Sequence, residues 1–234
     1  MMPMPFFFGD VTSLLLIPAI ILSMWAQFRV SSSFNKYSQI MSRRGQSGAE
    51  VARSILQRNG IYDVNVELGQ GHLSDHYDPR TKTIRLSEAV YNSPSLAALG
   101  VAAHEAGHAL QHDTGYAPLA LRSFIVPVAG FGSKLAMPLL LVGFLMGEGG
   151  HFLIDLGILF FACAVLFQII TLPVEFNASR RAMTVLRDGM YLTEDEVKPT
   201  RKVLSAAAMT YVAATFVALL QLVRLILLSG RGRR

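Results

Sequence analysis

Three histidines at intervals of four residues raise the question of what this chain does. The stretch AAHEAGHALQH, from residue 102 to residue 112, carries His104, His108 and His112. An α-helix places residues i and i+4 on one face, about 6 Å apart along its axis, so two such imidazoles can share a metal ion. Roughly 12 Å of helical rise separates His104 from His112, whereas zinc lies about 2.1 Å from a ligand nitrogen. The spacing therefore predicts His104 and His108 as the metal-binding pair.

Glu105 lies between the two histidines and completes the pattern HExxH, in which the glutamate acts as the general base of zinc peptidases. The alternative is a helix with scattered histidines, in which the pattern arises by chance. The preceding residues favour the metal site, because Ser93 is suited to cap a helix and Pro94 to occupy its first turn. A catalytic zinc site keeps three protein ligands and leaves the fourth place to water, so a third ligand is required.

The composition predicts a membrane protein. Hydrophobic residues make up 52% of the 234 residues, and the mean hydropathy of +0.40 is too high for an ordinary soluble protein. About 20 apolar residues are needed to cross a hydrocarbon core of about 30 Å. Four segments are long enough, namely 6–28, 119–146, 152–174 and 203–228. The first lacks a basic n-region and a clear cleavage site, so we expect it to remain as an anchor rather than to be removed as a signal peptide.

Basic residues beside these segments predict the orientation of the chain in the plasma membrane. The link GEGG at 147–150 carries only Glu148. Lysines and arginines are enriched on the cytoplasmic side, which places both large polar segments and the active site there. Four full crossings would place the basic tail RGRR outside the cell, against this preference. Either the last apolar segment therefore enters and leaves the membrane on the same side, or the preference is not followed there. These basic flanks explain the net charge of +5 without a nucleic-acid partner. The basic residues are Arg29, Lys36, Arg43 and Arg44 after the first segment, and Arg180, Arg181, Arg187, Lys198, Arg201 and Lys202 after the third.

The polar segment between the first two spans predicts a small mixed region. Residues 47–59 have helical periodicity and end at Gly60, a suitable C-cap. Residues 61–68 alternate with period two, which indicates a half-buried strand, and the turn signal at 78–81 followed by alternation over 82–86 indicates a hairpin. We therefore expect an α-helical membrane protein with about four transmembrane helices and a small α+β zincin-like catalytic region containing a short sheet. The sheet either binds an extended substrate along one edge or only covers the HExxH helix.

Further along the chain, Thr193 and Glu196 form a capping-box pattern. The acidic run at 194–196 is accordingly interpreted as the solvated start of a helix.

The third ligand must be a histidine, aspartate, glutamate or cysteine outside the HExxH helix. Cys163, the single cysteine, lies in the third apolar segment, and His151 and Asp155 lie near its external end. Glu175 lies at the cytoplasmic end of that segment, where a helical pattern continues into LPVEFNASRRAM. Its carboxylate therefore faces the same aqueous boundary as the predicted histidine pair.

These motifs carry a resemblance to a known family. HExxH followed at a distance by ExxA(S/D)R resembles the gluzincin peptidases of the membrane. DHYDP, AAHEAGHALQH and LPVEFNASRRA together resemble the bacterial neutral zinc metallopeptidase family of the YugP type, from about residue 47 to residue 182. The resemblance implies a membrane-embedded zinc endopeptidase with His104, His108 and Glu175 as ligands and Glu105 as catalytic base.

The second ligand shell is the point at which the chain departs from related HtpX-type proteases. Those enzymes have an aspartate, which supports a ligand histidine, where this chain has Ser179. A serine can form the hydrogen bond but carries no charge. Asp113, Asn177 or Asp75 is the alternative source of that support.

The implied reaction needs a hydrogen-bond donor for the tetrahedral oxyanion besides the metal. His76 of DHYDP is the first candidate, followed by His72, Tyr77 and Arg181. In the alternative interpretation DHYDP only builds the hairpin turn. His112 is expected to be a histidine near the end of its helix, where the helix dipole favours its charge.

Two other classes of function are weighed against the peptidase. A membrane protein could bind zinc for a structural or transport role, but a structural site is usually closed by four protein ligands and would not need Glu105. The chain could also be a membrane scaffold with an incidental HExxH.

Expected partners are a peptide or unfolded membrane protein as substrate, and membrane lipid. The predicted segments are an anchor at 1–28, a catalytic region at 29–118, a transmembrane hairpin at 119–174, a third-ligand helix and cytoplasmic segment at 175–202, and an apolar helix with a basic tail at 203–234.

Overall fold

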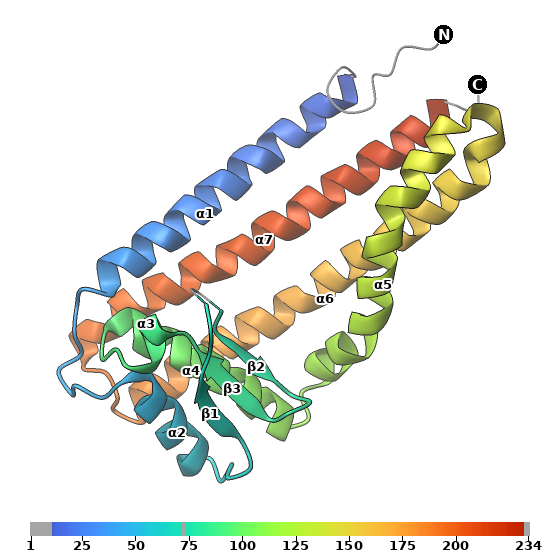
Figure 1. The fold of residues 1–234 in the computed structure, drawn as a ribbon. Helices are drawn as coiled ribbons and strands as arrows, with labels where there is room; N and C mark the ends of the chain where they lie inside the picture. The colour runs from blue at the N-terminus through green and yellow to red at the C-terminus, as the bar shows by residue number, and fades with distance from the viewer. Residues whose placement is uncertain (1–10, 72–73, 232–234) are drawn as a thin grey trace. The chain divides into compact units, whose positions relative to one another are not determined.

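A computed structural model describes residues 11–71 and 74–231 (Figure 1). The described chain is mainly helical and contains one small sheet, so the predicted fold class is confirmed. The elements are η1 (Val11–Leu16), α1 (Ile17–Tyr37), α2 (Gly48–Arg58), β1 (Asn65–Leu68), β2 (His76–Asp78), β3 (Thr83–Leu86), α3 (Glu88–Tyr91), α4 (Leu96–Asp113), α5 (Ala117–Leu145), η2 (Gly147–Gly150), α6 (His151–Asp188) and α7 (Glu194–Arg231).

The chain forms two compact units. We call the first the helical unit, which holds the described residues of Met1–Trp25, Leu121–Leu172 and Tyr211–Arg234. The second, the mixed unit, holds Ala26–Ala120 and Pro173–Thr210. All three strands and the HExxH helix α4 belong to the mixed unit. The division of the sequence into five functional segments is a separate matter and stays a prediction.

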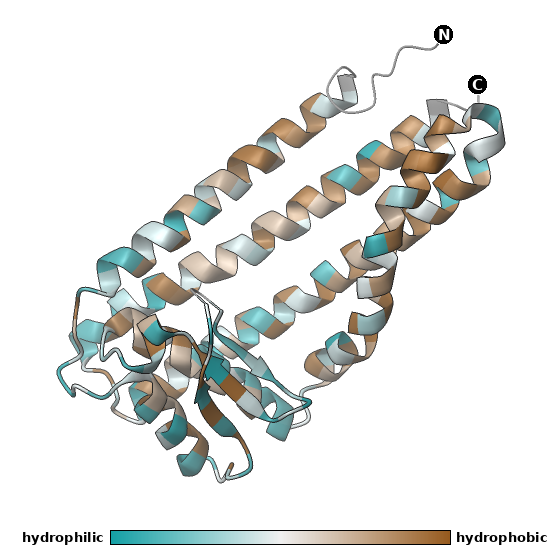
Figure 2. Ribbon diagram, in the orientation of Figure 1, coloured by the Kyte–Doolittle hydropathy of each residue, from teal (hydrophilic) through white to brown (hydrophobic). Residues whose placement is uncertain are grey.

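Four helices among the described residues are long and apolar enough to cross a membrane. Only 11% to 28% of the most apolar stretch of each helix is buried by protein. Most of the apolar surface of these helices is therefore left uncovered and is better suited to lipid than to water. Figure 2 shows the hydrophobic colouring along these long helices. The helices span Thr12–Tyr37, Ala117–Leu145, Gly147–Asp188 and Glu194–Gly230. The start of the first predicted span, at residues 6–10, lies outside the described residues.

The sheet of the mixed unit has the strand order β1-β3-β2, with β1 parallel to β3 and β2 antiparallel to it. The predicted hairpin is present as β2 and β3, which pair Tyr77 with Ile84. The strand predicted over 61–68 covers only Asn65–Leu68. The reason is that the N–H of Ile61 donates to the carbonyl of Leu56, which ends α2 and keeps this residue out of the sheet.

Helix α2 forms as its pattern predicts. The Ser47 side chain accepts from the N–H of Glu50, and the Glu50 carboxylate accepts from the N–H of Ser47, which completes a capping box. Val51 and Ile55 are buried in the same core as α4 and β3. The start of α2 is therefore determined by its local sequence.

Helix α4 begins later than predicted, so the assignment of Ser93 as its N-cap is wrong. Ser95 is the N-cap, and its side chain accepts from the N–H of Ala98. The cause is a distant segment, because the N–H of Ser42 donates to the Pro94 carbonyl at 2.9 Å and Met41 forms an isolated β-bridge with Ser95. These bonds hold residues 94 and 95 extended and delay the first helical turn.

The acidic start of α7 also differs from expectation. Glu196 is only 5% exposed, so the interpretation of the whole run as solvated is wrong for this residue. Its carboxylate accepts from the N–H of Arg43 at 2.8 Å and from the N–H of Thr193 at 2.8 Å. Glu196 therefore links the start of α7 to the chain segment that follows α1.

Candidate metal centre

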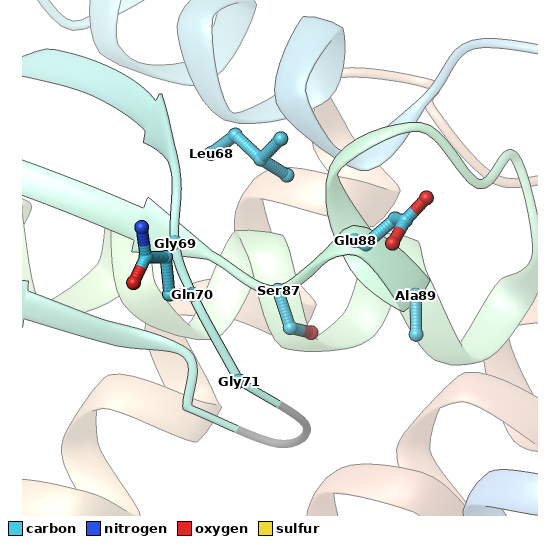
Figure 3. A pocket seen from close by; sticks show the side chains of 7 residues that line it. All are labelled: Leu68, Gly69, Gln70, Gly71, Ser87, Glu88 and Ala89. Atoms are coloured by element: carbon cyan, nitrogen blue, oxygen red, sulfur yellow. The ribbon is translucent and has the colours of Figure 1, made fainter.

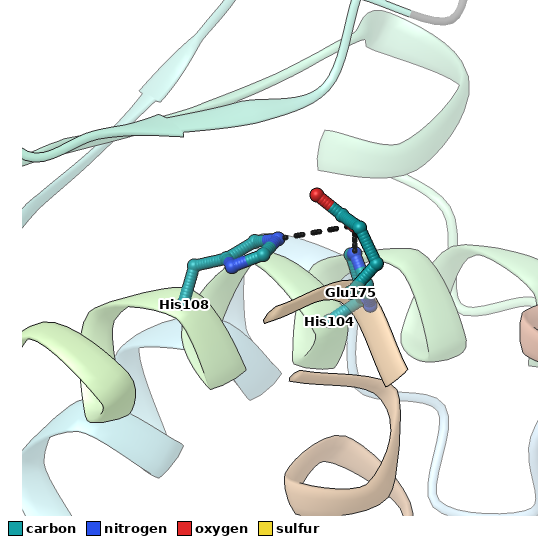
Figure 4. Close-up of side chains that lie close together, drawn as sticks. All are labelled: His104, His108 and Glu175. Atoms are coloured by element: carbon teal, nitrogen blue, oxygen red, sulfur yellow. Dashed lines mark hydrogen bonds and ion pairs between the residues drawn. The ribbon is translucent and has the colours of Figure 1, made fainter. Parts of the chain in front are cut away.

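His104 and His108 lie one turn apart on α4 with their rings edge to face, and the ring centroids are 4.8 Å apart. Glu175 approaches both rings from α6 (Figure 4). Its Oε2 lies 3.2 Å from Nε2 of His104 and 3.5 Å from Nε2 of His108. Glu175 is 2% exposed, and all three side chains lie in the mixed unit. The structure thus brings together the three residues predicted as ligands.

The geometry of this group fits zinc. In a tetrahedral site with ligands about 2.1 Å from the ion, two donor atoms are about 3.4 Å apart. The two nitrogen–oxygen separations of 3.2 and 3.5 Å lie on either side of that value. All donor atoms of the group lie within 4.8 Å of one another. Two imidazole nitrogens and a carboxylate oxygen are also the donor set of catalytic zinc in many peptidases.

The close approach of α4 and α6 depends on small side chains. A Cβ atom added at Gly107 would lie 2.7 Å from the carbonyl oxygen of Ala178, closer than real Cβ contacts permit. Ala103, Ala178 and Ala182 are completely buried. Gly107, the second of the two variable positions of HExxH, therefore lets the two ligand-bearing helices meet.

Ser179 lies where the resemblance places an aspartate in related proteases. Its hydroxyl is 3.2 Å from Nδ1 of His104, the ring nitrogen opposite the one that faces Glu175. The hydroxyl thus makes the contact expected of a supporting residue without bringing a charge. Of the three alternatives, Asp75 instead accepts from the N–H and hydroxyl of Ser87, and Asp113 is exposed on the last turn of α4.

Gln111 supports the other ligand, and the sequence interpretation missed it. Nδ1–H of His108 donates to Oε1 of Gln111 at 3.0 Å. The amide of Gln111 then donates to Oδ1 of Asn177 at 3.0 Å, so Asn177 acts one step away from the ligand. A polar residue three positions after a ligand histidine, on the same helical face, is the signal that could have identified it.

The electrostatic environment of the group favours cations. Burial by itself would lower the pKa of His108, but its hydrogen bond to Glu175 and the carboxylates of Glu105 and Glu175 outweigh burial and raise it. The same negative groups that strengthen binding of a proton would strengthen binding of a metal cation.

Glu105, the predicted base, is 7% exposed and lies on α4 between the two histidines. A buried carboxylate next to the ligands is where a general base is required. Its catalytic role stays a prediction.

The candidates for the oxyanion donor are dispersed. His76 is exposed at the start of β2, and its Nδ1–H donates to the Ser74 carbonyl at 2.7 Å. Its Nε2 could then donate only if the ring were protonated. Nε of Arg181 donates to Asn177. His72 lies outside the described residues.

Tyr77 and His112 form a pair at the last turn of α4. The Tyr77 hydroxyl lies 2.7 Å from Nδ1 of His112, which occupies the last turn of α4, as predicted. Burial, together with the carboxylates of Asp63, Asp78 and Asp113, raises the pKa of Tyr77 to about 12, so this hydroxyl stays protonated at neutral pH. Both side chains line a cavity of about 230 Å³.

A larger cavity of about 650 Å³ lies at the carboxyl ends of the parallel strands β1 and β3 (Figure 3). Among the described residues that line it, Glu88 is the only acidic one, and none of the three grouped ligands belongs to this lining. This cavity is therefore separate from the candidate metal centre. Its lining residues are Leu68, Gly69, Gln70, Gly71, Ser87, Glu88 and Ala89.

Comparison with known proteins supports the metal chemistry. The model of a family described as "Putative neutral zinc metallopeptidase" matches residues 12–230. A relative from Bacillus subtilis (strain 168), named "Putative membrane protease YugP", is 51% identical over 219 residues, which cover 94% of this chain and 96% of the relative. No solved structure matches the chain.

Proposed function

The chain belongs to this neutral zinc metallopeptidase family, and from that premise we propose that it is a membrane-embedded endopeptidase that hydrolyses peptide bonds. Zinc is its cofactor, and His104, His108 and Glu175 are the residues that would hold it. The observation that carries the proposal is the meeting of these three side chains beside the buried carboxylate of Glu105.

The number of ligands favours catalysis over a structural role. The grouped side chains among the residues that the structure describes number three, and a structural zinc site usually has four protein ligands. A site that only stored or transported zinc would also have no use for Glu105 between the two histidines. A zinc-binding protein without proteolytic activity is therefore the less favoured alternative.

Each residue of the centre has a task in the proposed reaction. Zinc held there would act as a Lewis acid that lowers the pKa of water and polarises the scissile carbonyl. Glu105 would accept the proton of the attacking water and pass it to the leaving amine. Ser179 would orient the imidazole of His104, and Gln111 that of His108, in each case through a hydrogen bond to Nδ1 of the ring. His76 remains the first candidate for the oxyanion donor, and Tyr77 the second.

The sheet supports binding of an extended peptide along β2. The other edge strand, β1, has its Val66 carbonyl occupied by the guanidinium of Arg53 at 2.9 Å, and the same guanidinium donates to the Tyr91 hydroxyl. Strand addition at β1 would have to break that bond, whereas β2 is the edge strand that packs against α4. The proposed substrate is therefore a peptide or an unfolded membrane protein in extended form.

We further propose that the site faces the cytoplasm from the plasma membrane, on the basis of the lysines and arginines that follow the first and third spans. The test is cysteine labelling in intact cells with a membrane-impermeant thiol reagent. A cysteine at Arg43 or Lys198 should be protected, and one at Gly149 should react. Cys163 lies within α6 and provides the background control. Reaction at Arg43 would reverse the orientation but leave the zinc centre intact.

The decisive test of the peptidase is the substitution Glu105→Gln. The amide keeps the shape of the side chain but cannot accept a proton, so zinc should stay stoichiometric while cleavage of an unfolded membrane protein is lost. Zinc content and cleavage are measured on the same preparation of full-length protein in detergent. Full cleavage by the variant, or no cleavage by zinc-loaded wild type, would contradict the proposal.

A further inference from the structure

The side-chain amide of Gln111 makes three hydrogen bonds next to the metal centre. It is fully buried on α4, one turn after His108. Its Nε2 donates to the Val174 carbonyl at 2.8 Å and to Oδ1 of Asn177 at 3.0 Å. Its Oε1 accepts from His108 at 3.0 Å. Both hydrogens of the amide nitrogen and one lone pair of the oxygen are therefore used.

The partners of Gln111 leave its amide only one orientation. The Val174 carbonyl can only accept a hydrogen bond, and Oδ1 of Asn177 is identified as an acceptor because Nε of Arg181 also donates to it at 2.9 Å. The NH₂ group of Gln111 must face these two oxygens, so its own oxygen faces His108. Nδ1 of His108 must then carry the hydrogen, and in the neutral ring that binds a metal this leaves the lone pair of Nε2 directed to the side of Glu175.

The same amide also connects the two ligand-bearing helices. Val174 directly precedes Glu175 on α6, and Gln111 lies three residues after His108 on α4. A shift of one helix relative to the other that separated the ligands would therefore also lengthen a hydrogen bond of Gln111. His104 also contacts α6, through the Ser179 hydroxyl, but that hydroxyl can either donate or accept and therefore does not select a tautomer.

We propose that Gln111 is a positioning residue that fixes the tautomer of His108 and the distance between His108 and Glu175, so that the metal centre is preorganised. This inference rests on the proposed zinc centre but not on the proteolytic reaction. It predicts that removal of the amide weakens zinc binding more than an equal loss of core packing does.

The test compares Gln111→Leu with Leu110→Ala, its neighbour in the core, in full-length protein in detergent. Zinc affinity is measured by competition with a chromophoric chelator, and thermal unfolding is measured on the same samples. Gln111→Leu should weaken zinc binding by about 10- to 100-fold, the usual effect of losing a residue that supports a metal ligand. Leu110→Ala removes buried apolar contacts without touching a ligand, so its zinc affinity should stay within about threefold of wild type.

A spectroscopic measurement separates positioning from stability. Cobalt(II) replaces zinc in such sites, and its visible absorption reports the ligand geometry. The bands should shift in Gln111→Leu and stay unchanged in Leu110→Ala. A third variant, Asn177→Ala, removes one of the two acceptors but leaves the Val174 carbonyl to orient the amide. Its zinc affinity should fall by less than about fivefold, well short of the usual loss for a directly supporting residue.

Several outcomes would overturn the role of Gln111. One is a Gln111→Leu protein with wild-type zinc affinity and cobalt spectrum. Another is an equal loss of affinity in Gln111→Leu and Leu110→Ala, which would reduce the effect to stability. Wild-type protein that binds zinc but cleaves no peptide would overturn the proposed proteolysis alone, because the ratio of the zinc affinities would still decide the role of Gln111.

Discussion

The helical unit and the mixed unit use apolar residues for different purposes. The apolar stretches of the four long helices are at most 28% buried by protein. Helix α4 in the mixed unit is also rich in alanine and leucine, but most of its residues are buried within the protein. Apolar composition alone therefore does not show whether lipid or protein covers a helix. The polar residues distinguish the two cases.

Three buried polar side chains of the mixed unit have partners in distant segments. Glu175, Gln111 and Glu196 are each at most 5% exposed and each accepts or donates hydrogen bonds between distant segments. In the helical unit, buried Thr171 instead bonds to the backbone of its own helix, at the Phe167 carbonyl. We expect substitutions to be costly where partners are distant and mild where they are local.

The largest contrast is expected between Glu175 and Thr171, which lie one turn apart on α6 but belong to different units. Glu175→Ala removes a predicted ligand and should abolish stoichiometric zinc binding, as His108→Ala should. Thr171→Val keeps the shape of the side chain and should leave zinc bound. Metal content of the purified proteins is the measurement. His112→Ala is a second control, and loss of zinc in that variant but not in Glu175→Ala would invalidate the ligand set.

A smaller contrast is expected between two helical glycines. Gly107→Ala places a Cβ atom 2.7 Å from the Ala178 carbonyl, so α4 and α6 must move apart. Overpacking of this kind costs about 1–3 kcal/mol, and we expect weaker zinc binding as well. Gly130 in α5 has no atom of the described chain within 4 Å of an added Cβ.

Gly130→Ala should therefore change the free energy of unfolding by less than about 1 kcal/mol and leave zinc affinity unchanged. Denaturation in detergent and zinc competition are measured on both variants. Equal effects at the two glycines would show that the close approach of α4 and α6 does not control the metal centre.

The smallest contrast is expected between two serines. Ser95→Ala removes the side-chain cap of α4 and should lower the free energy of unfolding of the mixed unit by about 1 kcal/mol. Ser133 on α5 bonds to the Gly130 carbonyl of its own helix and is exposed. Ser133→Ala should change the free energy of unfolding by no more than about 0.5 kcal/mol. Chemical denaturation measures both variants, and an unchanged free energy of unfolding in Ser95→Ala would argue that the bonds from residues 41 and 42 alone set the start of α4.

Local patterns were enough to predict a large part of the molecule. The spans follow from the length of apolar runs, and the histidine pair follows from the spacing of residues on one helix, because both signals lie within a few turns of the chain. Glu175 could be named from its position at the end of a span and from the family resemblance. Its distance from the histidines, however, depends on how closely α4 and α6 pack. The sequence shows Gly107, but only the structure shows that Ala178 lies opposite it and that the two helices meet there.

The remaining features were decided by bonds between residues far apart in the sequence. Helix α4 starts at Leu96 rather than after Ser93 because residues 41 and 42 pair with residues 94 and 95. Glu196 is buried because the N–H of Arg43 is its partner. Gln111 is a connecting residue because Val174 and Asn177 lie beside it on another helix. Periodicity identifies which face of a helix is polar, but only the tertiary structure shows which distant group satisfies each polar atom.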